Sequence, residues 1–69
     1  MSAIEVDVNG ERKRLEQACT ITELLEGLEL GGKRVAVAVN RDVVIRSRHA
    51  EHRIADGDRI EILEAVGGG

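Results

Sequence analysis

The chain has 69 residues, of which 10 are basic and 13 are acidic, for a net charge of −3, and it contains no Phe, Tyr, Trp or Pro. This length gives one small domain, the acidic balance argues against nucleic-acid binding, and the lack of aromatic rings removes the stacking surface that single-stranded nucleic acid needs. A lone cysteine cannot form an internal disulfide and no apolar run approaches a membrane span, so we expect a cytoplasmic protein with no nucleic-acid or membrane partner.

A β-hairpin is expected near the beginning of the chain. Apolar and polar residues alternate over the segment 4–8, which is typical of a half-buried strand. Asn9 and Gly10 follow, a pair that favours a two-residue hairpin turn. A second strand is expected from residue 11 to about residue 17, with Leu15 as its only strong hydrophobe.

One short amphipathic helix is expected over residues 21–29. Thr20 and Glu23 have the spacing of a capping box, in which the two side chains bind free backbone N–H groups at the helix start. The glycine pair at 31–32 predicts the end of the helix. Gly27 within the helix costs about 0.5–1 kcal/mol relative to alanine, which close packing on a sheet would explain.

The second half of the chain predicts further strands and their connections. These are, in chain order, a strand at 35–39, a turn at 40–42, a strand at 43–45, a polar connector at 46–53 with a short helical turn, a tight turn at 56–58 and a strand at 59–65. Ile54 is expected to fill the core beneath the connector. One helix against a mixed sheet of four or five strands buries these apolar faces, and this α+β arrangement is the ubiquitin-like β-grasp.

The last strand should also carry apolar side chains away from the core. Its two isoleucines are expected to face inward, so Leu63 and Ala65 point outward. They should share a sheet face with Ala36 and Ala38. An exposed apolar patch beside a chain terminus is typical of a docking surface, although an isolated exposed Leu63 would be a common feature of any protein.

The expected domain covers residues 1–65 and is followed by a flexible glycine-rich tail at 66–69. The last three residues are glycines, which lack a Cβ and can enter a narrow channel. Fully extended, they reach roughly 10 Å, at about 3.3–3.6 Å each. The carboxylate of Gly69 is therefore a candidate substrate for an activating enzyme, and an inert, disordered end is the alternative.

Candidate catalytic and metal sites are weak. His49 and His52 have no clear third ligand nearby, so surface positions are expected for both. Cys19 precedes the helix with no identifiable base, and we expect a buried or partly buried residue. The segments 31–33 and 56–58 lack the spacing of a phosphate loop and a calcium loop. No catalytic residue and no metal ligand is assigned.

Several short segments follow one another in the order of a known family. They are Thr20-Ile21-Thr22-Glu23-Leu24-Leu25, Ala36-Val37-Ala38-Val39-Asn40, Arg46, Asp56-Gly57-Asp58 and the final Gly68-Gly69. In this order and spacing the chain resembles the thiamine-biosynthesis sulfur carrier protein family, ThiS, over nearly its whole length. It departs from the family at Ile45, where a proline often precedes the matching arginine, and at His49, where an aromatic residue often stands.

The resemblance implies a carrier protein and not an enzyme. An E1-like adenylating enzyme (ThiF-like) would use ATP to adenylate the terminal carboxylate, and a persulfide from a sulfur donor such as a cysteine desulfurase would convert it to a thiocarboxylate. A thiazole synthase (ThiG-like) would take this sulfur to build the thiazole ring of thiamine. The chain itself would bind no cofactor. The residue roles would be sulfur carrying for Gly69, threading into narrow active sites for Gly68 and Gly67, and partner docking for Val66, Ala65 and Leu63.

Three other functions stay open. The small subunit of molybdopterin synthase uses the same tail chemistry, but it usually has aromatic residues and a longer chain. A ubiquitin-like modifier would be joined through Gly69 to a lysine. A β-grasp interaction module would have an inert tail.

Overall fold

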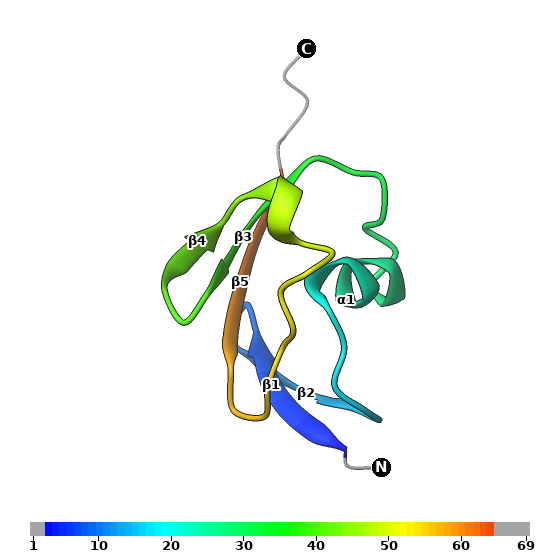
Figure 1. Cartoon of the computed structure of the whole chain (residues 1–69). Helices are drawn as coiled ribbons and strands as arrows, with labels where there is room; N and C mark the ends of the chain where they lie inside the picture. The colour runs from blue at the N-terminus through cyan, green and yellow to red at the C-terminus, as the bar shows by residue number, and fades with distance from the viewer. Residues whose placement is uncertain (1–2, 65–69) are drawn as a thin grey trace.

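The structure is a computed structural model that describes residues 3–64. Within these residues the protein consists of a five-stranded sheet and one α-helix that packs on one face of it (Figure 1). The elements are, in chain order, β1 (Ile4–Val8), β2 (Glu11–Leu15), α1 (Ile21–Gly27), β3 (Val35–Val39), β4 (Asp42–Val44), the 3₁₀-helix η1 (Arg46–Arg48) and β5 (Arg59–Glu64). The expected mixed sheet with one short helix is confirmed. The boundary at residue 65 and the tail at 66–69 lie outside the described residues.

The sheet has the order β2-β1-β5-β3-β4, with β5 in the centre. The β1–β5 pair is parallel, and the remaining pairs are antiparallel. The predicted hairpin is confirmed: Asn9 and Gly10 have φ angles of 52° and 86°, the left-handed values that a tight two-residue turn requires. The second strand ends at Leu15, two residues earlier than expected.

The start of α1 is fastened by side chains and by the connector. The capping box is confirmed, because the Thr20 N–H donates to Glu23 Oε1 at 2.9 Å and the Glu23 N–H donates to Thr20 Oγ1 at 3.2 Å. The next free donors also find acceptors: the N–H groups of residues 21 and 22 donate to the carbonyl oxygens of His52 and His49. These two hydrogen bonds fasten the connector to the helix, and they also supply acceptors for N–H groups that have no partner within the helix.

The end of α1 differs from the expectation. The helix ends at Gly27 and not near residue 29, and Glu29 takes the left-handed position with φ of 64°. The Leu30 N–H donates to the Leu25 carbonyl at 2.8 Å and the Glu29 N–H donates to the Glu26 carbonyl at 3.0 Å, which is the Schellman pattern. The expectation of close packing at Gly27 is also wrong, because a Cβ at this position would meet no atom within 4 Å.

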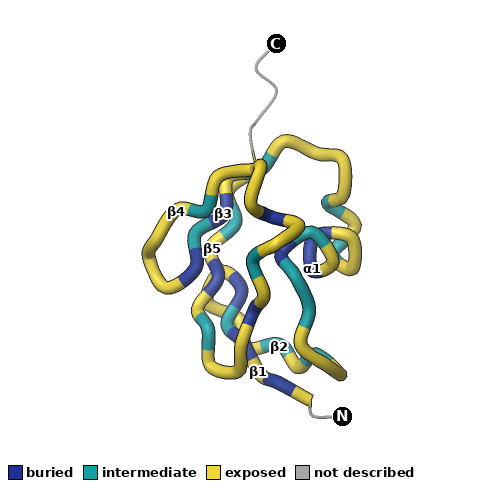
Figure 2. Tube along the Cα trace, viewed as in Figure 1, coloured by how far each residue is buried: buried dark blue, intermediate teal, exposed yellow. Residues whose placement is uncertain are grey.

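The core lies between α1 and the sheet and is entirely aliphatic. Figure 2 shows its buried residues along the inner strands and on the helix face turned toward them. They are Ile4, Val6, Val8, Ile21, Leu24, Leu25, Val37, Val39, Ile54 and Ile60. The expected role of Ile54 is confirmed, since it is 1% exposed beneath the connector. In the part of the chain that is described, the only buried polar side chain is that of His49.

Two asparagine side chains hold β5 in register, one at its first residue and one at Ile62. The Asn9 amide donates to the Ile62 carbonyl at 3.1 Å and accepts from the Ile62 N–H at 2.8 Å, which continues the strand pairing beyond the end of β1. Asn40 accepts from the Arg59 N–H at 2.9 Å and donates to Asp58 at 3.0 Å. The central strand is thus fixed along its length by side chains as well as by its neighbours.

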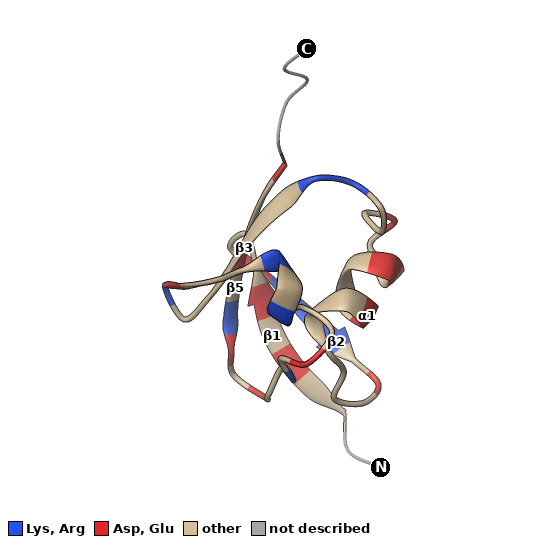
Figure 3. Cartoon of the chain, turned by 45° about the horizontal axis from the view of Figure 1, so that its top comes forward, with Lys and Arg blue, Asp and Glu red and all other residues tan. Residues whose placement is uncertain are grey.

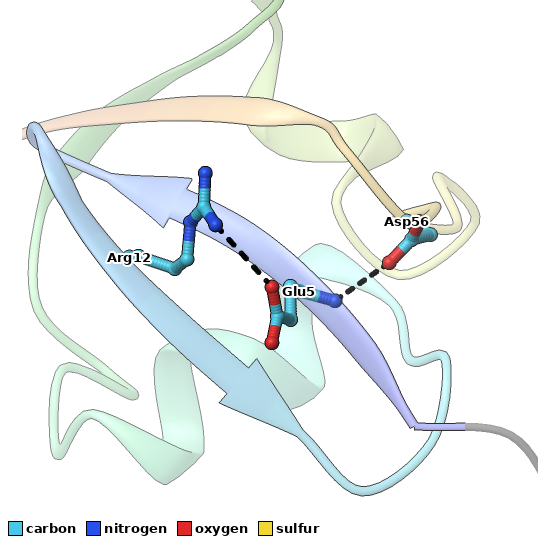
Figure 4. Close-up of polar contacts among 3 residues, drawn as sticks. All are labelled: Glu5, Arg12 and Asp56. Carbon is cyan, nitrogen blue, oxygen red and sulfur yellow. Dashed lines mark hydrogen bonds and ion pairs between the residues drawn. The ribbon is translucent and has the colours of Figure 1, made fainter.

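The turn before β5 is tied to the first strand. Asp56 Oδ1 accepts a hydrogen bond from the Glu5 N–H at 2.8 Å (Figure 4). The Gly57 N–H also donates to the Glu5 carbonyl at 2.7 Å. Gly57 has φ of 87°, so the expected tight turn is confirmed. The same figure shows the exposed ion pair between Arg12 and Glu5, with 3.6 Å between nitrogen and oxygen.

Candidate functional site

The central strand β5 leads directly toward the C-terminal end of the chain. Its last residue, Glu64, pairs with Val35 of β3, and Lys33 Nζ lies 3.6 Å from Glu64 Oε2. Ladders on both sides hold the strand, since β1 pairs with its first two residues and β3 with nearly its whole length. The proposed tail residues would therefore leave from a rigid body. Gly67, Gly68 and Gly69 themselves lie outside the described residues.

An exposed apolar surface covers the sheet face opposite α1. Leu63 is 74% exposed and lies directly across the β3–β5 ladder from Ala36, while Ala38 lies across from Val43 of β4. We call these four residues, Ala36, Ala38, Val43 and Leu63, the outer face. They line one open hollow of about 670 Å³. The expected outward patch is confirmed for Leu63 and the two alanines, and the expected docking residues Ala65 and Val66 lie outside the described residues.

The border of the outer face is polar. Arg59 and Glu61 of β5 line the same hollow, together with the turn at Asn9 and Gly10. An apolar centre with a charged border is the usual composition of a protein–protein interface. A surface that is open and shallow suits a folded partner better than a small molecule, which would need a more enclosed cavity.

Sequence reasoning missed Val43, which is 75% exposed. The sequence predicts a short strand at 43–45, but it assigns no outward face to that strand because Val44 and Ile45, which follow Val43, are also apolar. The β3–β4 register supplies the missing information by setting Val43 beside Ala38. The sequence pattern alone contains no signal that would have fixed this register.

The expectation of surface positions for both histidines is wrong for His49. It is 6% exposed, and its Nε2 lies 2.9 Å from the carbonyl oxygen of Val44. A carbonyl oxygen only accepts, so Nε2 carries the hydrogen in this bond. The 3₁₀-helix η1 lies between Val44 and His49, and its turn brings the ring back to the Val44 carbonyl. His52 is half-buried, and no group of three metal-binding side chains exists within residues 3–64.

Cys19 is half-buried beside the core, as expected. Burial raises the pKa of its thiol above the ordinary value, the charge of Glu23 raises it further, and Arg53 acts in the opposite direction. A raised pKa keeps the thiol protonated near neutral pH and makes it a poor nucleophile.

No helix within the described part of the chain is long and apolar enough to cross a membrane.

A family model, a relative and a solved structure agree on one family. The ThiS family model matches residues 4–69. The sulfur carrier protein ThiS of Escherichia coli is 30% identical over 66 residues, which cover 96% of this chain and 100% of that protein. The crystal structure of the thiamine biosynthesis protein ThiS from Geobacter metallireducens superposes with a TM-score of 0.82 at 30% identity and covers 96% of this chain and 100% of the other.

A thiazole synthase of Paramagnetospirillum magneticum is 36% identical to this chain over 62 residues. This match covers 90% of the present chain but only 19% of the synthase, so the chain spans about a fifth of that relative's length. The close superposition on the Geobacter protein confirms the ubiquitin-like β-grasp fold. Because the family model matches almost from end to end, the chain belongs to the ThiS family.

Proposed function

We propose that this chain is a sulfur carrier protein of thiamine biosynthesis, and that the carboxylate of Gly69 is the group that carries the sulfur. The observation that supports this most strongly is the match to the ThiS family over residues 4–69, which includes the glycine tail. As a member of this family the chain is a carrier and not a catalyst. Its terminus is a substrate that other proteins modify and then restore.

The proposed chemistry has two stages. First, a carboxylate oxygen of Gly69 attacks the α-phosphorus of ATP on a ThiF-like activating enzyme, pyrophosphate leaves, and an acyl-adenylate forms. Second, a persulfide sulfur attacks the carbonyl carbon and AMP leaves, and a second thiol then breaks the sulfur–sulfur bond to release the thiocarboxylate. Adenylation is needed because the oxygen of a free carboxylate is a poor leaving group. ATP belongs to the activating enzyme, and the carrier needs no cofactor of its own.

The proposed acceptor is a thiazole synthase of the ThiG type. A stretch of the Paramagnetospirillum thiazole synthase resembles this chain over 62 residues, which supports a working relation between the carrier fold and that enzyme. The sulfur donor is proposed to be an enzyme such as a cysteine desulfurase. The proposed setting is the cytoplasm, in keeping with a lone free cysteine in a chain without a disulfide.

The globular body supplies recognition in this proposal. A short tail alone can contact little protein surface, so the outer face would provide most of the binding free energy. Leu63 lies on that face, one residue before the last residue that the structure describes. Ala65 and Val66 are proposed to extend the contact toward the channel, and Gly67 and Gly68 to pass through it because they have no side chain to obstruct it.

A valine at Gly68 tests the threading role. We expect Gly68→Val to abolish thiocarboxylate formation by a cognate activating enzyme and a sulfur source, because the branched side chain would block the channel. Gly27→Val is the matched control: a Cβ at Gly27 meets nothing within 4 Å, so this variant should be modified normally. Mass spectrometry of the C-terminal peptide provides the measurement. Normal modification of Gly68→Val would contradict the threading role.

A further inference from the structure

Two arginines lie at the end of the molecule from which the proposed tail leaves. Val35 pairs with Glu64, so Arg34 lies one position beyond the end of the β3–β5 ladder, beside the point where the chain continues past Glu64. Arg46 begins η1. Figure 1 places η1, the start of β3 and the end of β5 at the same end of the molecule, far from β2.

At this end of the molecule, these two arginines have no ion-pair partner among the described residues. Lys33 pairs with Glu64 and Arg48 pairs with Glu51, each with 3.6 Å between nitrogen and oxygen. Neither Arg34 nor Arg46 forms an ion pair with any residue between positions 3 and 64.

Two of the cations at this end, but not Arg34, line one small cavity. Lys33 and Arg46 line the same hollow of about 180 Å³ between the loop before β3 and η1, where Glu26 is the only acidic lining residue. We call Lys33, Arg34 and Arg46 the basic end. It is a local exception in a chain of net charge −3, and Figure 3 shows blue on the loop that leads into β3 and on η1.

The position of the basic end relative to Gly69 determines which part of a partner protein it can contact. Five residues separate Glu64 from the carboxylate of Gly69. Held extended in a channel, they span up to about 18 Å, at about 3.3–3.6 Å each. The reacting carboxylate and the phosphates of ATP would then lie deep in the partner, while the basic end would lie against the surface around the channel opening.

We propose that the basic end docks on an acidic rim around the channel opening of the activating enzyme, and that Arg34 and Arg46 are specificity-determining residues for that encounter. This inference rests on the proposed sulfur carrier function. The acidic remainder of the chain is repelled by such a rim, so the molecule approaches with the tail leading. Exposed charges of this kind raise the association rate and favour the correct orientation, and they act less on the chemical step.

The test compares charge reversals at the two ends of the molecule. Arg34→Glu and Arg46→Glu are assayed singly for adenylation by the activating enzyme at low and high salt. Arg14→Glu on β2 is the matched control, because Arg14 is exposed, lies at the far end and changes the net charge equally. Arg46→Lys keeps the charge. Melting curves check that each variant folds.

We expect each reversal at the basic end to lower kcat/KM by about tenfold at low salt, mainly through a higher KM. The difference should shrink at roughly 1 M salt, where the screening length falls to about 3 Å. Arg14→Glu and Arg46→Lys should stay within about twofold of the unchanged chain. Equal rates for Arg34→Glu, Arg46→Glu and Arg14→Glu would overturn the docking role of the basic end but not the proposed carrier function. Failure of the unchanged chain to be adenylated at all would contradict the proposed function instead.

Discussion

His49 shows how one side chain can fasten a connector. Its ring is buried beneath η1 and donates from Nε2 to the Val44 carbonyl, while its own carbonyl accepts from the Thr22 N–H at the start of α1. The residue thus links the end of β4, the connector and the helix. A polar ring is suited to this place because it fills volume and also donates a hydrogen bond to the backbone carbonyl at the end of β4.

We expect His49→Ala to lower the free energy of unfolding by about 1–3 kcal/mol, because it removes the hydrogen bond from the ring to the Val44 carbonyl and leaves the volume of the buried ring empty. Urea denaturation followed by circular dichroism is the measurement. His49→Phe keeps a ring of similar shape and should lose less than His49→Ala. His52→Ala, at a half-buried position in the same connector, should change stability by about 0.5 kcal/mol or less. Equal losses in His49→Ala and His52→Ala would contradict the role of His49.

At the scale of the element, α1 shows which local signals are reliable. The capping box was readable because both of its hydrogen bonds join residues three positions apart. The helix end was not readable, because Glu29 occupies the left-handed position that usually favours glycine. Leu30 explains the early end, since it turns back to pack against the core instead of continuing the helix. Tertiary packing therefore overrides the local preference of the chain at this position.

A glycine at position 29 should relieve that backbone strain. We expect Glu29→Gly to raise the free energy of unfolding by up to about 1 kcal/mol, because a left-handed backbone costs a residue with a Cβ about that much. Thermal melting measures the effect, and 1 kcal/mol corresponds to about 4–8 °C for a domain of this size. Glu26→Gly is the control within α1 and should be destabilising by a similar amount. A lower melting temperature for Glu29→Gly would contradict the strained position.

At the scale of the whole molecule, the two faces of the sheet and the two ends of the molecule differ in character. The helix covers one sheet face, the outer face stays exposed on the other, and the basic end borders the end of β5. The sequence could predict Leu63 on the outer face, because alternation along one strand is a local pattern. It could not predict that Val43 joins Leu63 or that Arg34 and Arg46 gather at one end. Both depend on sheet register and on the path of the connector, which no short-range pattern encodes.

A charge on the outer face tests its role in docking. We expect Leu63→Glu to lower the rate of thiocarboxylate formation by about tenfold, since loss of one central apolar contact costs more than about 1 kcal/mol of binding. Its stability should hardly change, because Leu63 is 74% exposed. Ile45→Glu is the matched control: Ile45 is 61% exposed but does not line the hollow of the outer face. Equal rates for the two variants would argue against docking through this face.

The central claim is that Gly69 carries sulfur, and the intact mass of the chain tests it most directly. The chain is incubated with ATP, a cognate activating enzyme and a sulfur source, and the enzyme is shown to be active on another carrier. The account predicts a mass gain that matches replacement of one oxygen by sulfur, located in the C-terminal peptide. An unchanged mass, or conjugates formed through Gly69 to lysine, would contradict it.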